Sequence, residues 1–235
     1  MRRMFKRKKL ENYSHLEVVE RPNSFVSESI QKLIINLEHA NVDGKFKAIQ
    51  VTSTLASEGK TTLAGNMAIL LAQRNYKVIV IDLDLRKPKM HRLFQFSNDV
   101  GIINCLHGSA TIGQAVKKTT HGIDVLVAGE RTSAVSNLLQ STKLVEIINK
   151  FKEEYDYVLI DTPPIQVNSD AVMISKLIDG VIYVVAYDAV KKNLIRDGVN
   201  ELKRHDIPII GTVFTQYKMP KRAFHYNYYY YDDEY

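Results

Sequence analysis

Eight residues in the first third of the chain have the composition of a loop that binds phosphate. They read T-L-A-S-E-G-K-T from Thr54 to Thr61, between a segment that predicts a strand and one that predicts a helix. In such a loop, backbone N–H groups at the helix N-terminus point at phosphate oxygens. Gly59 allows close approach of the backbone, Lys60 reaches the β- and γ-phosphates, and the Thr61 hydroxyl ligates a metal ion. The pattern is typical of a P-loop.

This motif predicts ATP and Mg²⁺ as ligands. One position departs from the usual pattern, because Thr54 stands where the first glycine is expected. Taken alone, the segment could therefore also be a polar strand-to-helix turn. The residues expected to contact the nucleotide are Thr54, Ser57, Glu58, Gly59, Lys60, Thr61 and Thr62.

Two acidic segments support the phosphate site. The apolar run KVIVI leads into Asp82-Leu83-Asp84, and YVLI leads into Asp161. Both place a carboxylate at the carboxyl end of a strand, where parallel sheets bind ligands. An aspartate after a hydrophobic strand is the expected partner of Mg²⁺ beside a P-loop, although each aspartate taken separately could cap a helix or a turn.

The elements that must position these residues alternate in type along the chain. Continuous valine and isoleucine runs predict strands of a parallel sheet that is covered on both faces. We expect an α/β, doubly wound, mostly parallel sheet with helices on both faces, the fold of P-loop NTPases. The expected strands are 47–52, 77–81, 122–127, 157–160, 181–186 and 208–213, and the expected helices are 27–39, 61–74, 142–153, 171–177 and 192–203.

The ends of the chain differ from its centre. We divide it into a basic N-terminal segment (1–24), a P-loop domain (25–216) and a flexible, tyrosine-rich C-terminal tail (217–235). Residues 1–24 are expected to be irregular.

Charge and cysteine content narrow the possible partners. The chain of 235 residues has a net charge of +6, but six of its 32 basic residues lie within residues 1–9, which leaves 26 basic against 26 acidic residues elsewhere. A neutral body argues against a nucleic-acid partner. The basic segment could contact an anionic membrane surface or be merely solvated. Cys105 is the only cysteine, which excludes an internal disulfide and fits a cytoplasmic protein.

Four segments together resemble one family. They are SEGKTT (57–62), VIVIDLDLRKP (78–88), YVLIDTPP (157–164) and the terminal tyrosine cluster. The chain resembles the bacterial tyrosine kinases that regulate capsule and exopolysaccharide synthesis. It is most similar to the form in Gram-positive bacteria, in which the kinase is a separate cytoplasmic chain. The resemblance covers roughly residues 25–235.

The resemblance implies a protein-tyrosine kinase and assigns roles to its residues. Lys60, Asp82 and Asp84 match catalytic positions, and Thr61, Asp84 and Asp161 match positions near the metal. A tyrosine hydroxyl has a pKa near 10 and needs an acceptor for its proton. We expect Asp82 to be that acceptor and Asp84 to support Mg²⁺, although the two roles could be exchanged.

The resemblance also implies autophosphorylation of the tail and a set of partners. These are the cytoplasmic end of a membrane activator protein, which would place the kinase at the inner face of the cell membrane, and a tyrosine phosphatase. The expected phosphoacceptors are Tyr226, Tyr228, Tyr229, Tyr230, Tyr231 and Tyr235.

The segment 27–39 departs from the family pattern E-A-Y-R-x-L-R-T-N, which joins neighbouring subunits into a ring. Ile30, Gln31 and Ile34 stand where the pattern has tyrosine and two arginines. Because the planar fork of arginine is not replaced by glutamine or isoleucine, the sequence leaves ring, dimer and monomer open.

Two other functions are compatible with these sequence features. One is an ATPase switch of the kind that positions division sites or partitions plasmids, whose loop normally carries a second lysine where this chain has Leu55. The other is a non-enzymatic ATP-binding adaptor of a polysaccharide assembly complex. Activity distinguishes them: the switch releases phosphate to water, and the adaptor transfers none.

Overall fold

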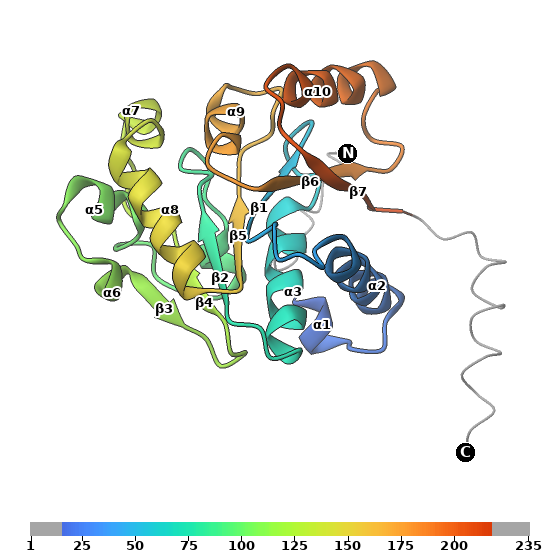
Figure 1. The fold of residues 1–235 in the computed structure, drawn as a ribbon, viewed down its shortest axis with the longest axis horizontal. Coiled ribbons are helices and arrows are strands. Elements are labelled where there is room, and N and C mark those ends of the chain that lie inside the picture. The colour runs from blue at the N-terminus through green and yellow to red at the C-terminus, as the bar shows by residue number, and fades with distance from the viewer. Residues whose placement is uncertain (1–15, 218–235) are drawn as a thin grey trace, which may run out of the picture.

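Valine and isoleucine runs form the centre of a single sheet (Figure 1). The structure is a computed structural model that describes residues 16–217, and within this part the sheet has seven strands in the order β3-β4-β2-β5-β1-β6-β7. Each neighbouring pair is parallel except β3 with β4, which is antiparallel. The strands are β1 Ala48–Ser53, β2 Val78–Asp82, β3 Val116–Lys118, β4 Asp124–Leu126, β5 Tyr157–Asp161, β6 Gly180–Ala186 and β7 Ile209–Thr215.

Helices cover both faces of this sheet, as the sequence predicted. Strand β2 shows why, because successive side chains of a strand point to opposite faces. Val78 and Val80 pack in the apolar core that contains helix α3, whereas Ile79 and Ile81 pack in a second core that contains helix α8. The helices of eight or more residues are α2 Phe25–Ala40, α3 Lys60–Gln73, α8 Thr142–Glu154 and α10 Lys192–Arg204.

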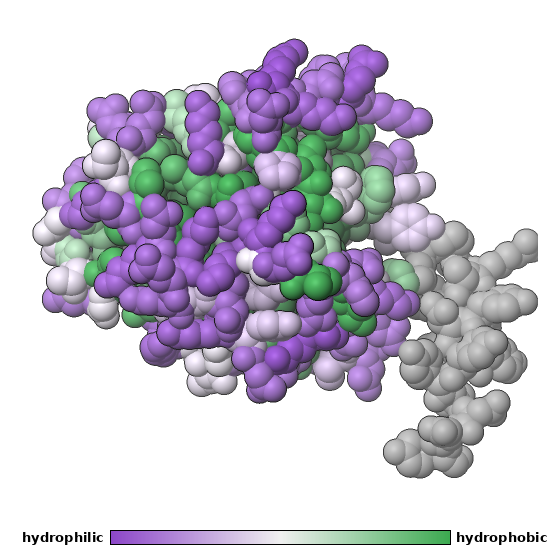
Figure 2. Space-filling view, viewed as in Figure 1, coloured by the Kyte–Doolittle hydropathy of each residue, from purple (hydrophilic) through white to green (hydrophobic). Residues whose placement is uncertain are grey.

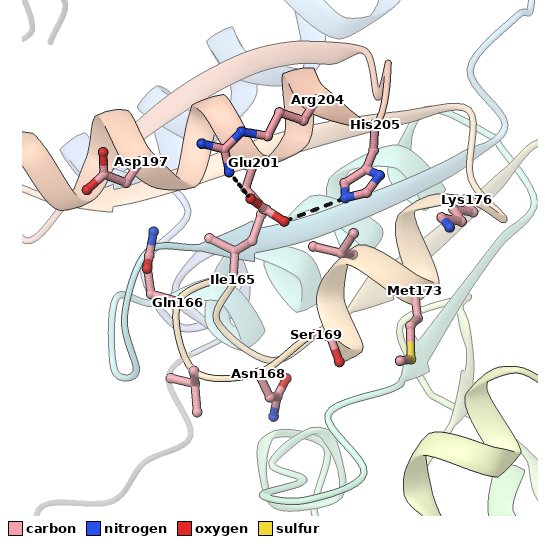
Figure 3. A pocket seen from close by; sticks show the side chains of 12 residues that line it. Ile165, Gln166, Asn168, Ser169, Met173, Lys176, Asp197, Glu201, Arg204 and His205 are labelled. Carbon is pink, nitrogen blue, oxygen red and sulfur yellow. Dashed lines mark hydrogen bonds and ion pairs between the residues drawn. The ribbon is translucent and has the colours of Figure 1, made fainter.

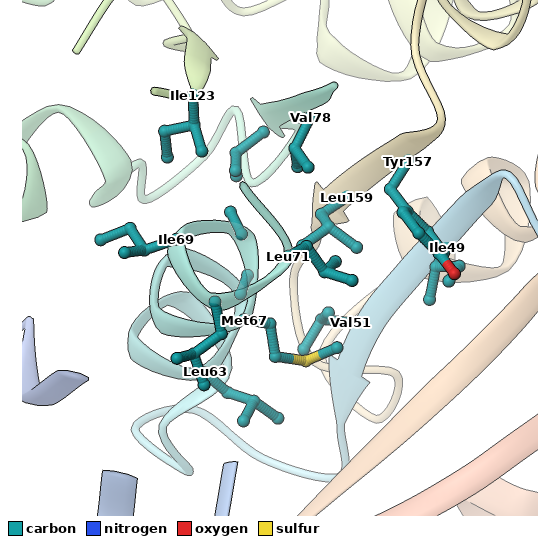
Figure 4. Close-up of a cluster of buried hydrophobic side chains, with 14 of the residues drawn as sticks. Ile49, Val51, Leu63, Met67, Ile69, Leu71, Val78, Ile123, Tyr157 and Leu159 are labelled. Atoms are coloured by element: carbon teal, nitrogen blue, oxygen red, sulfur yellow. The ribbon is translucent and has the colours of Figure 1, made fainter. Parts of the chain in front are cut away.

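Helix α3 is apolar on nearly all sides because it lies between the sheet and α2. Leu63, Met67 and Leu71 are almost completely buried and meet Val51 and Leu159 of the sheet in the same core (Figure 4). Burial of each such side chain contributes roughly 1.5–3 kcal/mol relative to leaving it in water. The core therefore holds the helix whose first residue is Lys60 firmly against the strands.

Six shorter helices complete the described part of the chain. The expectation of irregular structure before residue 25 is wrong for residues 17–20, because Val18 is buried and its N–H donates to Oδ1 of Asn66 on α3. The sequence pattern also missed strand β3. The short helices are α1 Glu17–Glu20, α4 Met90–Leu93, α5 Ile102–His107, α6 Ile112–Ala115, α7 Val135–Leu139 and α9 Asp170–Ser175.

Polar and charged side chains cover most of the face seen in Figure 2, and apolar side chains show between them in its upper half. Across residues 16–217, none of the helices combines the length and apolar character that a membrane crossing requires. The basic residues 1–9 and the expected phosphoacceptor tyrosines lie outside the described residues.

Candidate active site

The register of the sheet brings the three motif segments to one edge. Strands β2, β5 and β1 are neighbours, and Asp82 at the end of β2 pairs in register with Asp161 at the end of β5. Val51 of β1 pairs with the same Asp161. Because all three strands are parallel, the loops that follow them leave on the same side of the molecule. The P-loop, the D-L-D-L segment and the D-T-P-P segment therefore meet there.

The P-loop connects the end of β1 at Ser53 to the start of α3 at Lys60. Two of its residues have left-handed backbone conformations, Ser57 with φ 65° and Gly59 with φ 91°. Gly59 adopts this region without strain, and it turns the chain into the helix. The side chain of Lys60 is largely buried, with a residue exposure of 7%. A lysine held in this position at a helix N-terminus fits the phosphate-binding role.

Thr61 and Asp161 lie next to each other at the centre of the site. The Thr61 hydroxyl donates a hydrogen bond of 2.6 Å to Oδ2 of Asp161. Asp161 is buried, and its other carboxylate oxygen, Oδ1, has no hydrogen-bond partner in the described structure. A buried carboxylate oxygen without a partner is costly unless a cation or water completes it. These oxygen donors fit Mg²⁺, which prefers oxygen ligands and is usually held by one or two carboxylates together with phosphates.

Asp82 is fully buried, and its carboxylate accepts backbone N–H groups. Oδ1 accepts from Asp84 at 3.1 Å, and Oδ2 accepts from Lys89 at 3.0 Å and from Met90 at 2.9 Å. Lys89 and Met90 form the N-terminus of α4, so Asp82 caps this short helix. Asp84 is only partly buried, and its Oδ1 accepts the N–H of Lys87 at 3.1 Å. Of the two aspartates, Asp84 is thus the one with access to solvent.

Two of the residues expected to contact nucleotide support the loop instead. The carboxylate of Glu58 is buried and accepts the N–H of Leu55 within the loop and, at 2.8 Å, that of Ala186 at the end of β6. Thr54 is buried as well, and its hydroxyl lies 3.0 Å from the hydroxyl of Tyr183. Both side chains point away from solvent, so only the backbone of these positions is available to phosphate.

A cavity of about 440 Å³ opens at the P-loop. Ser57, Gly59, Lys60, Thr61 and Thr62 contribute to its wall, as the motif predicted. The motif did not predict the other lining residues, which are Lys89, Arg92, Leu93 and Gln216. A basic run from residue 86 to 92 directly after the acidic motif was the signal that could have identified Lys89 and Arg92. Gln216 carried no such signal; its side chain donates to the Ser57 carbonyl at 2.7 Å.

Comparisons with known proteins identify the family of this chain. The family described as AAA domain matches residues 46–203. Tyrosine-protein kinase YwqD of Bacillus subtilis is 32% identical over 88% of both chains, and CapB of Staphylococcus aureus is 30% identical over 94% of this chain and 98% of its own length. The crystal structure of the chimerical protein CapA2B2 has 31% identity and a TM-score of 0.83, and the match covers 88% of this chain and 90% of that chain.

The chain belongs to the bacterial tyrosine kinase family. The comparisons confirm the fold class and the expectation of a protein-tyrosine kinase, and they favour it over the division-site switch and the adaptor.

Burial is the main cause of the pKa shifts in this kinase's site. It raises the pKa of Asp161 to about 6, although Lys60 and the Thr61 hydrogen bond oppose the shift. Burial and the neighbouring Asp161 raise the pKa of Asp82 well above its usual range, and burial also raises the pKa of Asp84. Desolvation lowers the pKa of Lys60, against the attraction of Asp161 and Asp84. Two buried carboxyl groups, a partly buried one and one lysine thus lie at this edge of the sheet, which favours binding of a cation that can neutralise the excess of negative charge.

A second cavity lies away from the motif residues, between α9 with the loop before it and α10. Its volume is about 590 Å³. Figure 3 shows Glu201 of α10 between Arg204 and His205, at 2.7 Å and 3.5 Å respectively. These are partly exposed pairs on one helix, and such pairs contribute little energy. The cavity contains no residue of the P-loop or of the acidic motifs, so we place the active site at the smaller cavity.

Proposed function

We propose that this kinase transfers the γ-phosphoryl group of ATP to tyrosine hydroxyls of its own C-terminal tail. The observation that carries the proposal is the Thr61–Asp161 contact, with the free Oδ1 of Asp161 beside the buried Lys60. A hydroxyl, a carboxylate and a lysine in this arrangement are the groups that phosphoryl transfer requires around a nucleotide.

The P-loop would bind ATP through its backbone and through Lys60. The N-terminus of α3 offers N–H groups without helical partners, and these together with the helix dipole favour phosphate. Lys60 would place its ammonium group against the β- and γ-phosphates. Lys89 and Arg92 line the same cavity and add positive charge to it.

Thr61 and Asp161 would hold Mg²⁺. The metal ion, when bound with ATP, neutralises phosphate charge and orients the γ-phosphoryl group for transfer. Asp161 contributes a carboxylate whose second oxygen is free, and Thr61 contributes its hydroxyl oxygen. Because burial raises the pKa of Asp161 to about 6, this residue accepts a cation more readily above that pH than below it.

Asp84 would accept the proton of the tyrosine hydroxyl, which exchanges the roles first expected for Asp82 and Asp84. Both oxygens of Asp82 already accept backbone N–H groups, and the residue is fully buried. Asp84 is partly exposed at the same edge of the sheet. Its raised pKa makes it a better proton acceptor than an ordinary aspartate. Asp82 would instead hold the backbone that carries Asp84.

The tail carries the proposed phosphoacceptors, which are Tyr226, Tyr228, Tyr229, Tyr230, Tyr231 and Tyr235. Each phosphate adds about −1.5 to −2 charges beside three acidic residues at positions 232–234. A phosphorylated tail would therefore be repelled from a site that contains three carboxyl groups. This repulsion supports a switch between a docked and a released tail, which would regulate capsular or extracellular polysaccharide synthesis and export.

We further propose that the kinase acts at the inner face of the cell membrane through the cytoplasmic end of a membrane activator protein, with a tyrosine phosphatase as its counterpart. Contacts between neighbouring subunits would depend on apolar side chains of α2, since the arginines of the ring-forming pattern are absent there. Ile35 on this helix is 40% exposed and Phe25 is 46% exposed, and both are available for such a contact.

The decisive experiment is incorporation of γ-labelled phosphate from Mg·ATP into the full chain and into a version that ends at Tyr217, each with and without an activator fragment. Alkali-stable label that is lost on truncation supports a tyrosine kinase that acts on its own tail. Release of phosphate to water without labelled protein would instead indicate a switch ATPase. ATP binding without either reaction would indicate an adaptor.

A further inference from the structure

A buried carboxylate outside the P-loop cavity forms an ion pair with the acidic-motif segment. Asp170, the first residue of α9, has an exposure of 1%. Its Oδ2 lies 2.5 Å from Nε of Arg86, and its Oδ1 lies 3.2 Å from Nη2. Two parallel contacts of this kind fix the orientation of both partners, because the guanidinium group is a rigid plane.

Arg86 connects this carboxylate to a third element. Its Nη2 also lies 3.3 Å from the hydroxyl of Ser136 in α7. Arg86 is the last residue of the D-L-D-L-R segment, so a single side chain ties the loop after β2 to α9 and α7. The ion pair is half-shielded, since the side chain of Arg86 is 44% exposed and that of Asp170 is 1% exposed.

The loop that carries Asp84 is thus held at its ends and in its middle. Its ends meet at Asp82, which accepts the N–H groups of Asp84, Lys89 and Met90. In its middle, Arg86 is fixed on Asp170. Asp84 lies between these two anchors, and a loop with both ends tethered has little freedom to move its side chains.

The first turn of α9 also bonds to β1, the strand before the P-loop, and is linked through it to the D-T-P-P segment. The side-chain amide of Gln50 in β1 donates at 3.0 Å to the carbonyl of Ala171 and at 3.0 Å to the hydroxyl of Thr162. Gln50 is fully buried, and Thr162 belongs to the D-T-P-P segment. The start of α9 therefore supports β1 and the loop of Asp84 directly, and the D-T-P-P segment through Gln50.

From this arrangement we propose that Arg86 and Asp170 are positioning residues for phosphoryl transfer, and that their ion pair holds Asp84 just beyond the end of β2. There its carboxylate acts on Lys60 of the P-loop. The inference rests on the proposed role of Asp84. Neither Arg86 nor Asp170 lines the P-loop cavity, so the pair acts through the loop and not on the nucleotide. Small displacements of a reacting group cost up to about 100-fold in rate. Nucleotide affinity depends mainly on the separate P-loop, and Lys89 in the same cavity stays anchored through its N–H to the carboxylate at the end of β2.

The test uses the full chain and the variants Arg86→Gln, Arg86→Lys, Asp170→Asn and the double variant Arg86→Gln/Asp170→Asn. Three quantities are measured for each: kcat for tyrosine phosphorylation, affinity for a fluorescent ATP analogue, and amide hydrogen exchange of residues 83–89. The double variant leaves no unpaired buried charge, so it reports on the contact even if a single variant folds poorly. Arg204→Gln, which removes an exposed ion pair with Glu201, is the matched control.

The expected result for Arg86→Gln and Asp170→Asn is a fall in kcat of about 100-fold, unchanged analogue affinity, and faster exchange in residues 83–89. The double variant should be no worse than either single variant, because the same interaction is removed only once. Arg86→Lys keeps the positive charge but not the planar guanidinium group that makes two contacts with Asp170, so its kcat should be intermediate. The control should match the unaltered chain in all three quantities.

Faster exchange with unchanged kcat would reduce the pair to a structural role and overturn the proposal. A fall in kcat without faster exchange in residues 83–89 would also overturn it. Failure of the proposed function has a different signature, because the unaltered chain itself would then phosphorylate no tyrosine, and failure of the Asp84 assignment alone would leave Asp84→Asn with full kcat. In that case the exchange measurement still reports whether the ion pair holds the loop.

Discussion

The hydroxyl of Thr61 donates to the carboxylate of Asp161 across one hundred positions of sequence, at 2.6 Å. This hydrogen bond joins the P-loop to the end of β5. Asp161 thereby has one oxygen engaged and one free. The pair presents oxygen atoms that are already in place, so a metal ion that enters with ATP meets a site that needs little rearrangement. Such preorganisation lowers the entropic cost of binding.

Lys60→Met should abolish tail phosphorylation and weaken ATP binding. The substitution keeps the length and apolar stem of the side chain and removes the charge that would face the phosphates. A charge-assisted contact of this kind contributes about 1.5–3 kcal/mol, so the affinity should fall by about 10- to 100-fold. Isothermal titration with ATP measures it, and Lys192→Met on the exposed start of α10 is the control. Full phosphorylation by the Lys60 variant would remove this lysine from the site.

Asp161→Asn should stabilise the nucleotide-free protein at neutral pH. The pKa of Asp161 is raised from its ordinary 3.8 to about 6 in the folded state. Between these values the folded state binds more protons than the unfolded state, so the stability contributed by this group is lost as the pH rises. Above pH 6 the ionised carboxylate therefore costs stability, and asparagine removes that cost.

Thermal unfolding at several pH values measures this effect. At pH 7.5 the Asp161 variant should melt on the order of 5 °C higher than the unaltered chain. The difference should shrink toward pH 5, where the native carboxyl is mostly protonated. Mg·ATP should raise the melting temperature of the unaltered chain only. An equal increase at all pH values would show that the titration of Asp161 is not its cause.

The long helices, the parallel strands and the meeting of the motif segments at one edge of the sheet could be predicted from the sequence, because each depends on a local pattern of residues. Apolar runs such as 77–81 require burial on both faces, and the P-loop reads as a strand, a glycine and a helix. The contacts that support the site could not be read in this way. Glu58 looks like a nucleotide contact in sequence, yet its carboxylate binds backbone of β6, which lies 128 positions further along the chain.

Asp170 illustrates the same limit. No motif in the sequence singles it out, and only the packing of α9 beside the loop after β2 brings Arg86 to it. The exchange of roles between Asp82 and Asp84 also depends on exposure, because their residue types and spacing are compatible with either assignment. The contacts of Glu58 and Asp170 and the proposed exchange of roles rest on tertiary distance, burial and hydrogen-bond satisfaction, and none of these has a fixed sequence period.

Glu58→Gln should loosen the P-loop. The carboxylate accepts the N–H of Leu55 and the N–H of Ala186 with different oxygens. Glutamine offers one acceptor oxygen in place of two, so one buried N–H loses its partner, which costs about 1–3 kcal/mol. We expect a lower melting temperature together with weaker ATP binding. Glu154→Gln, at an exposed position, should change neither, and an unaltered melting temperature for the Glu58 variant would contradict its supporting role.

Deletion of residues 1–9 should reduce binding to anionic vesicles. This segment carries six basic residues and no acidic residue. Attraction to anionic lipid amounts to about 1 kcal/mol per basic residue near the surface. Co-sedimentation with phosphatidylserine-containing vesicles measures it, with neutral phosphatidylcholine vesicles as the control. Equal partitioning of the two chains would leave the segment as solvated charge.

Asp82→Asn and Asp84→Asn should have different effects, because only one of these side chains is available to a substrate. Asp84→Asn should leave the fold and ATP affinity intact and lower the rate of tyrosine phosphorylation by about 100- to 10,000-fold, the range for loss of a general base. Asp82→Asn places an amide group where a carboxylate oxygen accepts N–H groups of the loop and of α4. Loss of these acceptors should cost about 0.5–2 kcal/mol, as loss of a helix cap does. Removal of a buried carboxyl group with a raised pKa offsets part of that cost at neutral pH. The substitution should also reduce the rate through the loop. Single-turnover phosphorylation and denaturant unfolding of both variants separate these effects. A stable Asp82 variant that binds ATP but transfers no phosphate, beside an active Asp84 variant, would return the acceptor role to Asp82.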